Sequence, residues 1–347
     1  MRRRKSLLVR ADASTQIGAG HVMRCLALGK AWQGAGGDVT FASAEIMPAV
    51  KRRLQQETIN VVAIEGESGS ELDGQHTGDL AKGLHAEWVV VDGYCFGPTY
   101  YRQLRQREVH SVAIDDDGRF EEYTSDVVLN QNASATETIY RNRQPYTKLL
   151  LGSSFVLLRP EFTSVTCKRD TPQVARNLLV TMGGSDPENV TLKVLRALND
   201  SWADDVNVKI VLGSGYRHTD ELRALVSTSK LSVSVEENPP DMVPLMAWAD
   251  MAISAAGGTC WELAYMGVPS ILTAISPDQV CIARAAMDRG AAYSLGWHAD
   301  ISGAHLAESV RMLGEDHERR RAMSRAGQKL VDGVGPKRVV EFLRSAA

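Results

Sequence analysis

The chain of 347 residues has few of the features that mark membrane or nucleic-acid-binding proteins. No uninterrupted apolar run approaches the roughly 18 residues that a membrane helix needs. The 39 basic and 42 acidic residues nearly balance, and a net charge of −3 gives no general attraction to nucleic acid or to an acidic lipid surface. We therefore expect no membrane insertion and no nucleic-acid partner.

Cysteines are also few, and they form no disulfide or zinc pattern. The five are scattered, odd in number and without a C-x-x-C pair: Cys25, Cys95, Cys167, Cys260 and Cys281. The basic start at residues 1–5 is followed by an apolar run that ends at Arg10, which is too short for a signal peptide. We expect reduced thiols, a cytoplasmic protein, and a monomer or weak dimer.

Common catalytic motifs are missing as well. There is no G-x-x-x-x-G-K-[ST] loop, no H-E-x-x-H helix and no G-x-S-x-G elbow, which argues against an NTPase, a zinc protease and a serine hydrolase. The glycines at 18 and 20 are not a dinucleotide fingerprint, because Met23 stands where the third glycine is required. Three adjacent aspartates, 115–117, cannot all point one way, and Asp-Gly favours a turn, so we expect a turn there rather than a metal site.

The sequence does contain a repeated alternation of strand-length apolar runs and helical segments, which predicts an α/β protein. Its length suggests two domains, and we expect them at 1–165 and 173–335, followed by a helix at 336–347. The polar, proline-ended run 166–172 is the expected linker. Residues 65–78, rich in Gly, Ser, Asp and Glu, are expected to form a mobile surface loop.

The first domain is organised around the segment from Ile17 to Arg24. An apolar strand precedes it and a helical pattern follows, so Gly18 and Gly20 would form a tight turn and His21 would lie in the first helical turn. The positive end of a helix favours an anion and disfavours imidazolium, so His21 is a candidate general base in its neutral form. The alternative is a histidine that caps an ordinary strand–helix turn.

A second cluster is expected at the same sheet edge. The strand 88–91 runs into Asp92 and Tyr94, and the carboxyl ends of parallel strands are where ligands bind. Both side chains should therefore lie near His21. The alternative for Tyr94 is a half-buried packing aromatic.

The second domain centres on the stretch from Ser254 to Glu262. A strand, the Gly257–Gly258 turn and a helix starting at Thr259 would hold a phosphate with backbone N–H groups and a hydroxyl. Glu262 could accept hydrogen bonds from ribose hydroxyls. The alternative is a capping box formed by Thr259 and Glu262, without a ligand.

Together these motifs resemble the PseG family of UDP-sugar hydrolases, in order along residues 6–340. The resemblance is carried by 10–24, 91–94, 129–132, 151–162, 183–186 and 254–262. It implies a GT-B fold of two Rossmann-like, doubly wound parallel-sheet domains that face a central cleft, as in the MurG glycosyltransferase. It also implies removal of UDP from UDP-2,4-diacetamido-2,4,6-trideoxy-β-L-altropyranose in pseudaminic acid synthesis, with inversion at C1 and without a metal or cofactor.

Residue by residue, the resemblance makes His21 the base that activates water, with Tyr94 beside the sugar. Because UDP is a good leaving group, one base and an anion site suffice, unlike the paired carboxylates of glycoside hydrolysis. Asp12 or Asp92 would orient His21, and the sequence does not choose between them. The expected substrate-binding residues are Asp12, Gly18, Gly20, Arg24, Asp92, Gly183, Gly184, Ser185, Ser254, Gly257, Gly258, Thr259, Glu262, Asp278 and Gln279.

One position departs from the family pattern. The family has an Asn-Gln pair where this chain has Asp278-Gln279. An ionised aspartate only accepts hydrogen bonds and repels phosphate, so the identity of the sugar stays open. Two other functions stay open as well, a GT-B glycosyltransferase with a sugar hydroxyl as acceptor and a UDP-sugar-binding protein without turnover.

Overall fold

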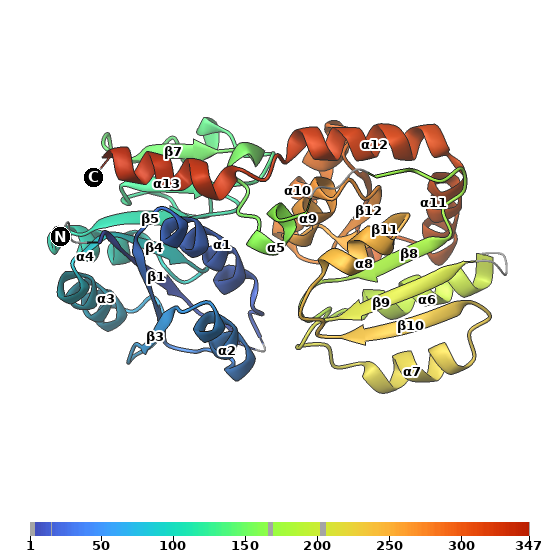
Figure 1. Cartoon of the computed structure of the whole chain (residues 1–347), viewed down its shortest axis with the longest axis horizontal. Helices are drawn as coiled ribbons and strands as arrows, with labels where there is room; N and C mark the ends of the chain where they lie inside the picture. The colour runs from blue at the N-terminus through green and yellow to red at the C-terminus, as the bar shows by residue number, and fades with distance from the viewer. Residues whose placement is uncertain (1–3, 15, 166–168, 202–205, 347) are drawn as a thin grey trace. The chain divides into compact units, whose positions relative to one another are not determined.

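The computed structural model describes residues 4–14, 16–165, 169–201 and 206–346. The chain divides into two compact units, residues 1–160 with 333–347 and residues 161–332 (Figure 1). The sequence placed this division between 165 and 173, and residues 166–168 of the expected linker lie outside the described residues. The last helix, α13 (Gly335–Ala346), belongs to the first unit.

The first unit is built on seven parallel strands in the order β3-β2-β1-β4-β5-β6-β7. The strands are β1 (Ser6–Ala11), β2 (Asp38–Ser43), β3 (Asn60–Ala63), β4 (Ala86–Asp92), β5 (His110–Ile114), β6 (Val127–Asn130) and β7 (Lys148–Leu151). Its other helices are α1 (Gly20–Gly34), α2 (Pro48–Gln56), α3 (Glu71–Leu84), α4 (Pro98–Gln106), and the 3₁₀ turns η1 (Glu137–Tyr140) and η2 (Ser153–Phe155).

Helices cover both faces of this sheet. Successive side chains of a strand point to opposite faces, so each strand contributes to two cores. Leu7 and Val9 of β1 share a core with residues of α1 and α13. Leu8, between them, joins the core formed with α3 and α4. The doubly wound arrangement explains why the strands read as continuous apolar runs.

The prediction of a loop at 65–78 is wrong for residues 71–78, because α3 begins at Glu71. The Ser70 hydroxyl caps this helix by accepting a hydrogen bond from the Asp73 backbone N–H. Gly74 and Gly78 looked like loop residues, but an added Cβ would collide with the side chains of Gln103 and Arg107. They are therefore contact points between helices rather than signs of a loop.

The second unit has six parallel strands in the order β10-β9-β8-β11-β12-β13. They are β8 (Asn177–Thr181), β9 (Asn207–Leu212), β10 (Ser232–Glu237), β11 (Met251–Ala255), β12 (Ser270–Ala274) and β13 (Tyr293–Trp297). The remaining helices are α5 (Pro160–Thr163), α6 (Val190–Ser201), α7 (Thr219–Ser227), α8 (Val243–Trp248), α9 (Thr259–Tyr265), α10 (Pro277–Asp288), α11 (Gly303–Glu315), α12 (His317–Leu330) and the 3₁₀ turn η3 (His298–Asp300).

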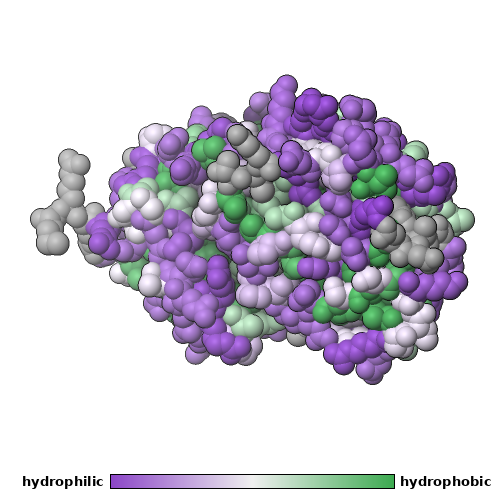
Figure 2. Space-filling view, turned by 45° about the vertical axis from the view of Figure 1, so that its right-hand side comes forward, coloured by the Kyte–Doolittle hydropathy of each residue, from purple (hydrophilic) through white to green (hydrophobic). Residues whose placement is uncertain are grey.

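Helices cover both faces of this sheet too. Leu178 and Val180 of β8 pack in one core with α6 and α11, and Leu179 packs in the other with α8 and α9. The prediction of two doubly wound parallel-sheet units is thus confirmed. No helix within the described ranges is long and apolar enough to cross a membrane, and the face drawn in Figure 2 is mainly hydrophilic with limited hydrophobic patches.

The contact between α9 and α12 supplies a first prediction. A Cβ on Gly327 of α12 would lie 2.8 Å from the carbonyl oxygen of Ala264 in α9. Gly327→Ala should therefore lower the free energy of unfolding by about 1–3 kcal/mol, although alanine is the better helix former. Urea unfolding followed by tryptophan fluorescence measures this loss.

Gly303→Ala is the matched control, because an added Cβ at the start of α11 would have its nearest neighbour, the Ala197 Cβ, at 4.0 Å. This variant should be at least as stable as the wild type. Equal stability of the two variants would contradict close backbone packing between α9 and α12.

Candidate functional site

The turn between β1 and α1 has the geometry that the sequence predicts. Gly18 has φ +74°, a conformation that favours glycine, and its N–H donates to the Ser14 carbonyl at 2.8 Å. Ala19 is the N-cap of α1, and no side chain caps it. A Cβ added at Gly20 would meet nothing within 4 Å, so open space adjoins the first helical turn. An uncapped helix start beside open space suits an anion.

His21 lies in this first turn, against the ring of Tyr94. Their ring centroids are 4.8 Å apart, and the planes meet at 85°. His21 is only 8% exposed, whereas Tyr94, which follows β4, is 48% exposed. Because Ala19 is the N-cap, His21 is not the capping residue that one interpretation of the sequence allowed.

Neither aspartate expected to orient His21 bonds to it. The Nδ1 atom of His21 is buried and has no hydrogen-bond partner among the residues described. The two carboxylates are instead occupied by arginines, Asp12 by Arg10 and Asp92 by Arg24. The expectation was wrong because proximity at a sheet edge does not say which cation a carboxylate binds.

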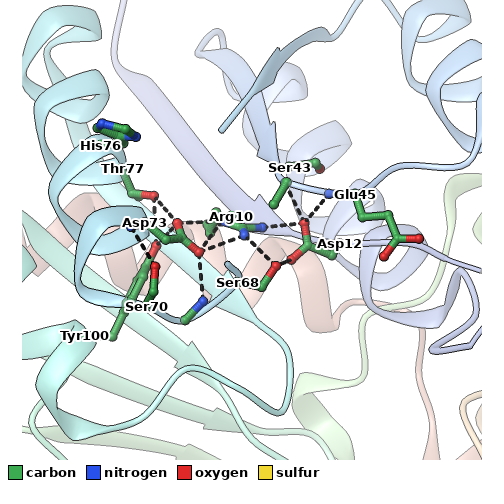
Figure 3. A network of polar contacts seen from close by, with 12 residues as sticks. Arg10, Asp12, Ser43, Glu45, Ser68, Ser70, Asp73, His76, Thr77 and Tyr100 are labelled. Atoms are coloured by element: carbon green, nitrogen blue, oxygen red, sulfur yellow. Dashed lines mark hydrogen bonds and ion pairs between the residues drawn. The ribbon is translucent and has the colours of Figure 1, made fainter. Parts of the chain in front are cut away.

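Asp12 belongs to a polar network around Arg10, which is fully buried (Figure 3). Arg10 donates to Asp12 at 2.6 Å and, through Nε and Nη2, to both oxygens of Asp73 in α3 at 2.9 and 2.8 Å. Asp12 also accepts from the Ser68 hydroxyl at 2.7 Å and from the Ala44 N–H at 2.8 Å. Burial alone would raise the pKa of Asp12, but Arg10 holds it below its ordinary value.

Asp92 is held by Arg24, one helical turn after His21. The Arg24 guanidinium binds both oxygens of Asp92 at 2.7 Å and one oxygen of Asp116 at 2.8 Å. Burial would raise the pKa of Asp116, but Arg24 keeps it below its usual range, with smaller contributions from His21 and Asn132. Arg24 and Asp92 therefore fix the α1–β4–β5 junction, and their polar groups are already engaged.

The aspartates after β5 form the expected turn. Asp115 accepts from the Gly118 N–H at 2.8 Å and from the hydroxyls of Tyr123 and Tyr140 at 3.1 and 2.7 Å. Asp117 pairs with Arg119 instead. Within the described part of the chain, no group of three or more His, Cys, Asp or Glu residues is arranged to hold a metal ion.

Arg119 is a residue that the sequence reasoning missed. Its guanidinium carbon lies 4.0 Å from the centroid of the Tyr94 ring. Its closeness to Tyr94 was predictable in part. The turn that carries Arg119 follows β5, and β5 pairs with β4, which ends just before Tyr94. Nothing in the sequence said which way the arginine would point.

In the second unit, two glycine turns pack together at the ends of β8 and β9. Gly183 has φ +81°, and the Gly215 N–H donates to the Gly184 carbonyl at 2.8 Å. A Cβ on Gly213 would lie 2.4 Å from that carbonyl oxygen, so this second turn supports the first. Gly183 and Gly184 remain exposed and Ser185 is partly exposed.

The turn after β11 matches the predicted strand–glycine–helix pattern, with two corrections. Ser254 is fully buried and donates its hydroxyl to the Ala255 carbonyl at 3.0 Å, so it offers no surface to a ligand. Gly258 is the N-cap of α9, so the helix already includes Thr259 and begins one residue too early for a Thr259 capping box. Glu262 lies one turn inside α9 and is partly exposed.

The structure brings Gly257 together with Gln279 of α10. The Nε2 atom of Gln279 lies 3.6 Å from the position of a Cβ on Gly257. Its Oε1 accepts from the Ile275 N–H at 3.1 Å, which fixes the amide. Asp278 lies beside Gln279 in the first turn of α10, so the ends of β11 and β12 present a glycine turn, an amide and a carboxylate at one sheet edge.

Comparison with known structures identifies the fold. The two parallel-sheet units form a GT-B fold, and Acinetobacter baumannii MurG aligns with a TM-score of 0.69 at 17% identity, over 98% of this chain and 99% of that one. Residues 178–334, which make up most of the second unit, match the glycosyltransferase family 28 C-terminal domain.

Two curated relatives are similar in sequence. The spore coat polysaccharide biosynthesis protein SpsG of Bacillus subtilis is 32% identical over 207 residues, 58% of this chain and 59% of the relative. The UDP-2,4-diacetamido-2,4,6-trideoxy-β-L-altropyranose hydrolase of Campylobacter jejuni is 27% identical over 194 residues, 55% of this chain and 65% of the relative. The alignments thus span less than two thirds of either relative.

The Arg10 network gives a prediction about stability. Arg10→Met leaves Asp12 and Asp73 without their buried counterion, so the first unit should lose about 3–5 kcal/mol of unfolding free energy. Urea unfolding of the full chain, followed by circular dichroism, measures the loss.

Arg4→Met is the control, because Arg4 pairs with Asp38 at an exposed site and should change stability by less than about 1 kcal/mol. Adding Asp12→Asn and Asp73→Asn to Arg10→Met should restore part of the stability. Similar losses in the Arg4 and Arg10 variants would refute the buried ion network.

Proposed function

We propose that this protein is an enzyme that releases UDP from a UDP-sugar by attack of water at C1, with His21 as the base. The observation that carries the proposal is His21 itself, held against Tyr94 in the uncapped first turn of α1 with open space beside Gly20. With Nδ1 buried, Nε2 is the ring nitrogen left to accept a proton.

The proposed reaction is balanced in atoms and charge. The water oxygen bonds to C1 as the bond from C1 to the phosphate oxygen breaks, and His21 takes the proton that the water loses. UDP departs with the electron pair, so the main further requirement is stabilisation of the departing diphosphate. Attack opposite to the leaving group inverts the configuration at C1.

The second unit would bind the nucleotide. We assign the diphosphate to the Gly257–Gly258 turn and the Thr259 hydroxyl, with the Gly183–Ser185 turn beside it. An added Cβ at Gly258 would meet nothing within 4 Å, so neither packing nor a positive φ accounts for glycine there. Gly258 is the N-cap of α9, a position that favours glycine, and the open space beside it leaves room for a ligand to approach the backbone.

Glu262 would accept hydrogen bonds from the ribose, as the resemblance to the PseG family implies. The Gln279 amide, already fixed through its oxygen, would donate to the sugar or diphosphate, and Asp278 would accept from a sugar hydroxyl or N–H group. The similarity to the Campylobacter jejuni hydrolase supports its named substrate as the first compound to test.

A glycosyltransferase is the second candidate. The match of residues 178–334 to the glycosyltransferase family 28 C-terminal domain favours it. Such an enzyme would use the same base and leaving group, with a sugar hydroxyl in place of water. The product separates the two, since a transferase joins the sugar to an acceptor and releases little free sugar when no acceptor is present.

The test is release of UDP from UDP-2,4-diacetamido-2,4,6-trideoxy-β-L-altropyranose. His21→Gln should lower kcat by about 10²- to 10⁴-fold, because it removes the base, while UDP binding measured by calorimetry stays the same. His305→Gln, an exposed histidine on α11, is the control and should leave the rate unchanged.

Unchanged release by His21→Gln would refute the role of His21. The wild type could instead bind UDP but cleave the UDP-sugar only when a sugar acceptor is added. That result would replace the hydrolase with the transferase.

A further inference from the structure

Three side chains from three neighbouring strand ends lie in contact, and one of them, His21, is the proposed base. His21 follows β1, Tyr94 follows β4 and Arg119 follows β5, and these strands are adjacent in the sheet. Arg119 lies 4.0 Å from the centroid of the Tyr94 ring, and the Tyr94 and His21 rings meet nearly at right angles. We propose that Arg119 is a positioning residue, which holds the Tyr94 ring against His21.

The arginine is itself held in a defined place. Asp117 binds it through two parallel contacts, Nε to Oδ1 and Nη2 to Oδ2, both at 3.0 Å. This bidentate geometry fixes the plane of the guanidinium as well as its position. Gly118, between the two residues, has φ +71°, and its N–H donates to Asp115 at 2.8 Å, so the turn that presents the pair is anchored.

Tyr94 is close to half exposed, and the Arg119 guanidinium lies over its ring. A core aromatic is fixed by contacts on all sides, whereas an exposed tyrosine has several staggered side-chain conformations open to it. The cation over its ring favours the conformation that also touches His21. Asp117 thus fixes Arg119, Arg119 holds the Tyr94 ring, and the ring restricts the His21 imidazole.

This inference rests on the proposed function for its importance, but its geometry can be measured without any substrate. The Tyr94 ring, which meets His21 nearly at right angles, shifts the His21 Cε1–H resonance through its ring current, and isotope-labelled histidine makes that signal visible by NMR. Loss of the signal in His21→Gln assigns it, and Tyr94→Leu gives the resonance position without the ring.

Arg119→Ala should move the His21 resonance toward its position in Tyr94→Leu. Arg119→Lys, which keeps the charge but not the planar fork, should move it part of the way, and Asp117→Asn should act in the same direction. In UDP-sugar turnover, Arg119→Ala should lower kcat by about 2- to 5-fold with little change in KM, because substrate contacts remain.

The chain offers a matched control elsewhere in the first unit. Arg105 lies 3.6 Å from the centroid of the Tyr146 ring and binds Asp126 at 2.7 Å, the same combination of ring and carboxylate. Arg105→Ala should leave the His21 resonance and the turnover rate unchanged.

A His21 resonance that stays in place in Arg119→Ala would overturn the proposal, whatever happens to activity. A raised KM together with an unmoved resonance would also overturn it and would make Arg119 a direct substrate contact. If the resonance moves but the wild type turns over no UDP-sugar, the positioning role stands and the proposed function fails.

Discussion

A single buried charge, the guanidinium of Arg10, fixes the part of the first unit on which the candidate base depends. It lies at the end of β1, fully excluded from solvent, and binds one carboxylate just after its own strand and one in α3. Taking three charges out of water is costly, so the arrangement persists only with nearly every hydrogen bond made. Asp12 extends the network to Ser68 and to the backbone after β2. The network therefore fixes Asp12, the first residue after β1.

A second arginine, Arg24, fixes the structure on the other side of the turn, at the start of α1. It ties α1 to the ends of β4 and β5 through Asp92 and Asp116. Arg10 binds Asp12 and Asp73, and Arg24 binds Asp92 and Asp116. His21 is left without a carboxylate partner for its Nδ1 atom among the described residues, and it packs against the Tyr94 ring. The candidate base is thus positioned by packing rather than by a hydrogen bond to an aspartate.

The sequence predicted the parts of the fold that depend on local pattern. Most of the strands, the glycine turns at 18–20, 183–184 and 257–258, and the place of His21 in the first turn of α1 follow from apolar periodicity and glycine placement. Helix α3 was missed because its glycines look like breakers until the neighbouring helix is known. The partners of Asp12, Asp73 and Asp92 could not be predicted, since Arg10 finds its second carboxylate 63 residues away. Long-range charge pairing leaves no periodic signal in a sequence.

The position of oxygen-18 after turnover tests the proposed chemistry most directly. The protein is incubated with UDP-2,4-diacetamido-2,4,6-trideoxy-β-L-altropyranose in ¹⁸O-water, and both products are examined by NMR and mass spectrometry. Water attack at C1 puts the label on C1 of an inverted free sugar and leaves the UDP unlabelled. Label in the UDP would mean attack at phosphorus and would contradict the role proposed for His21.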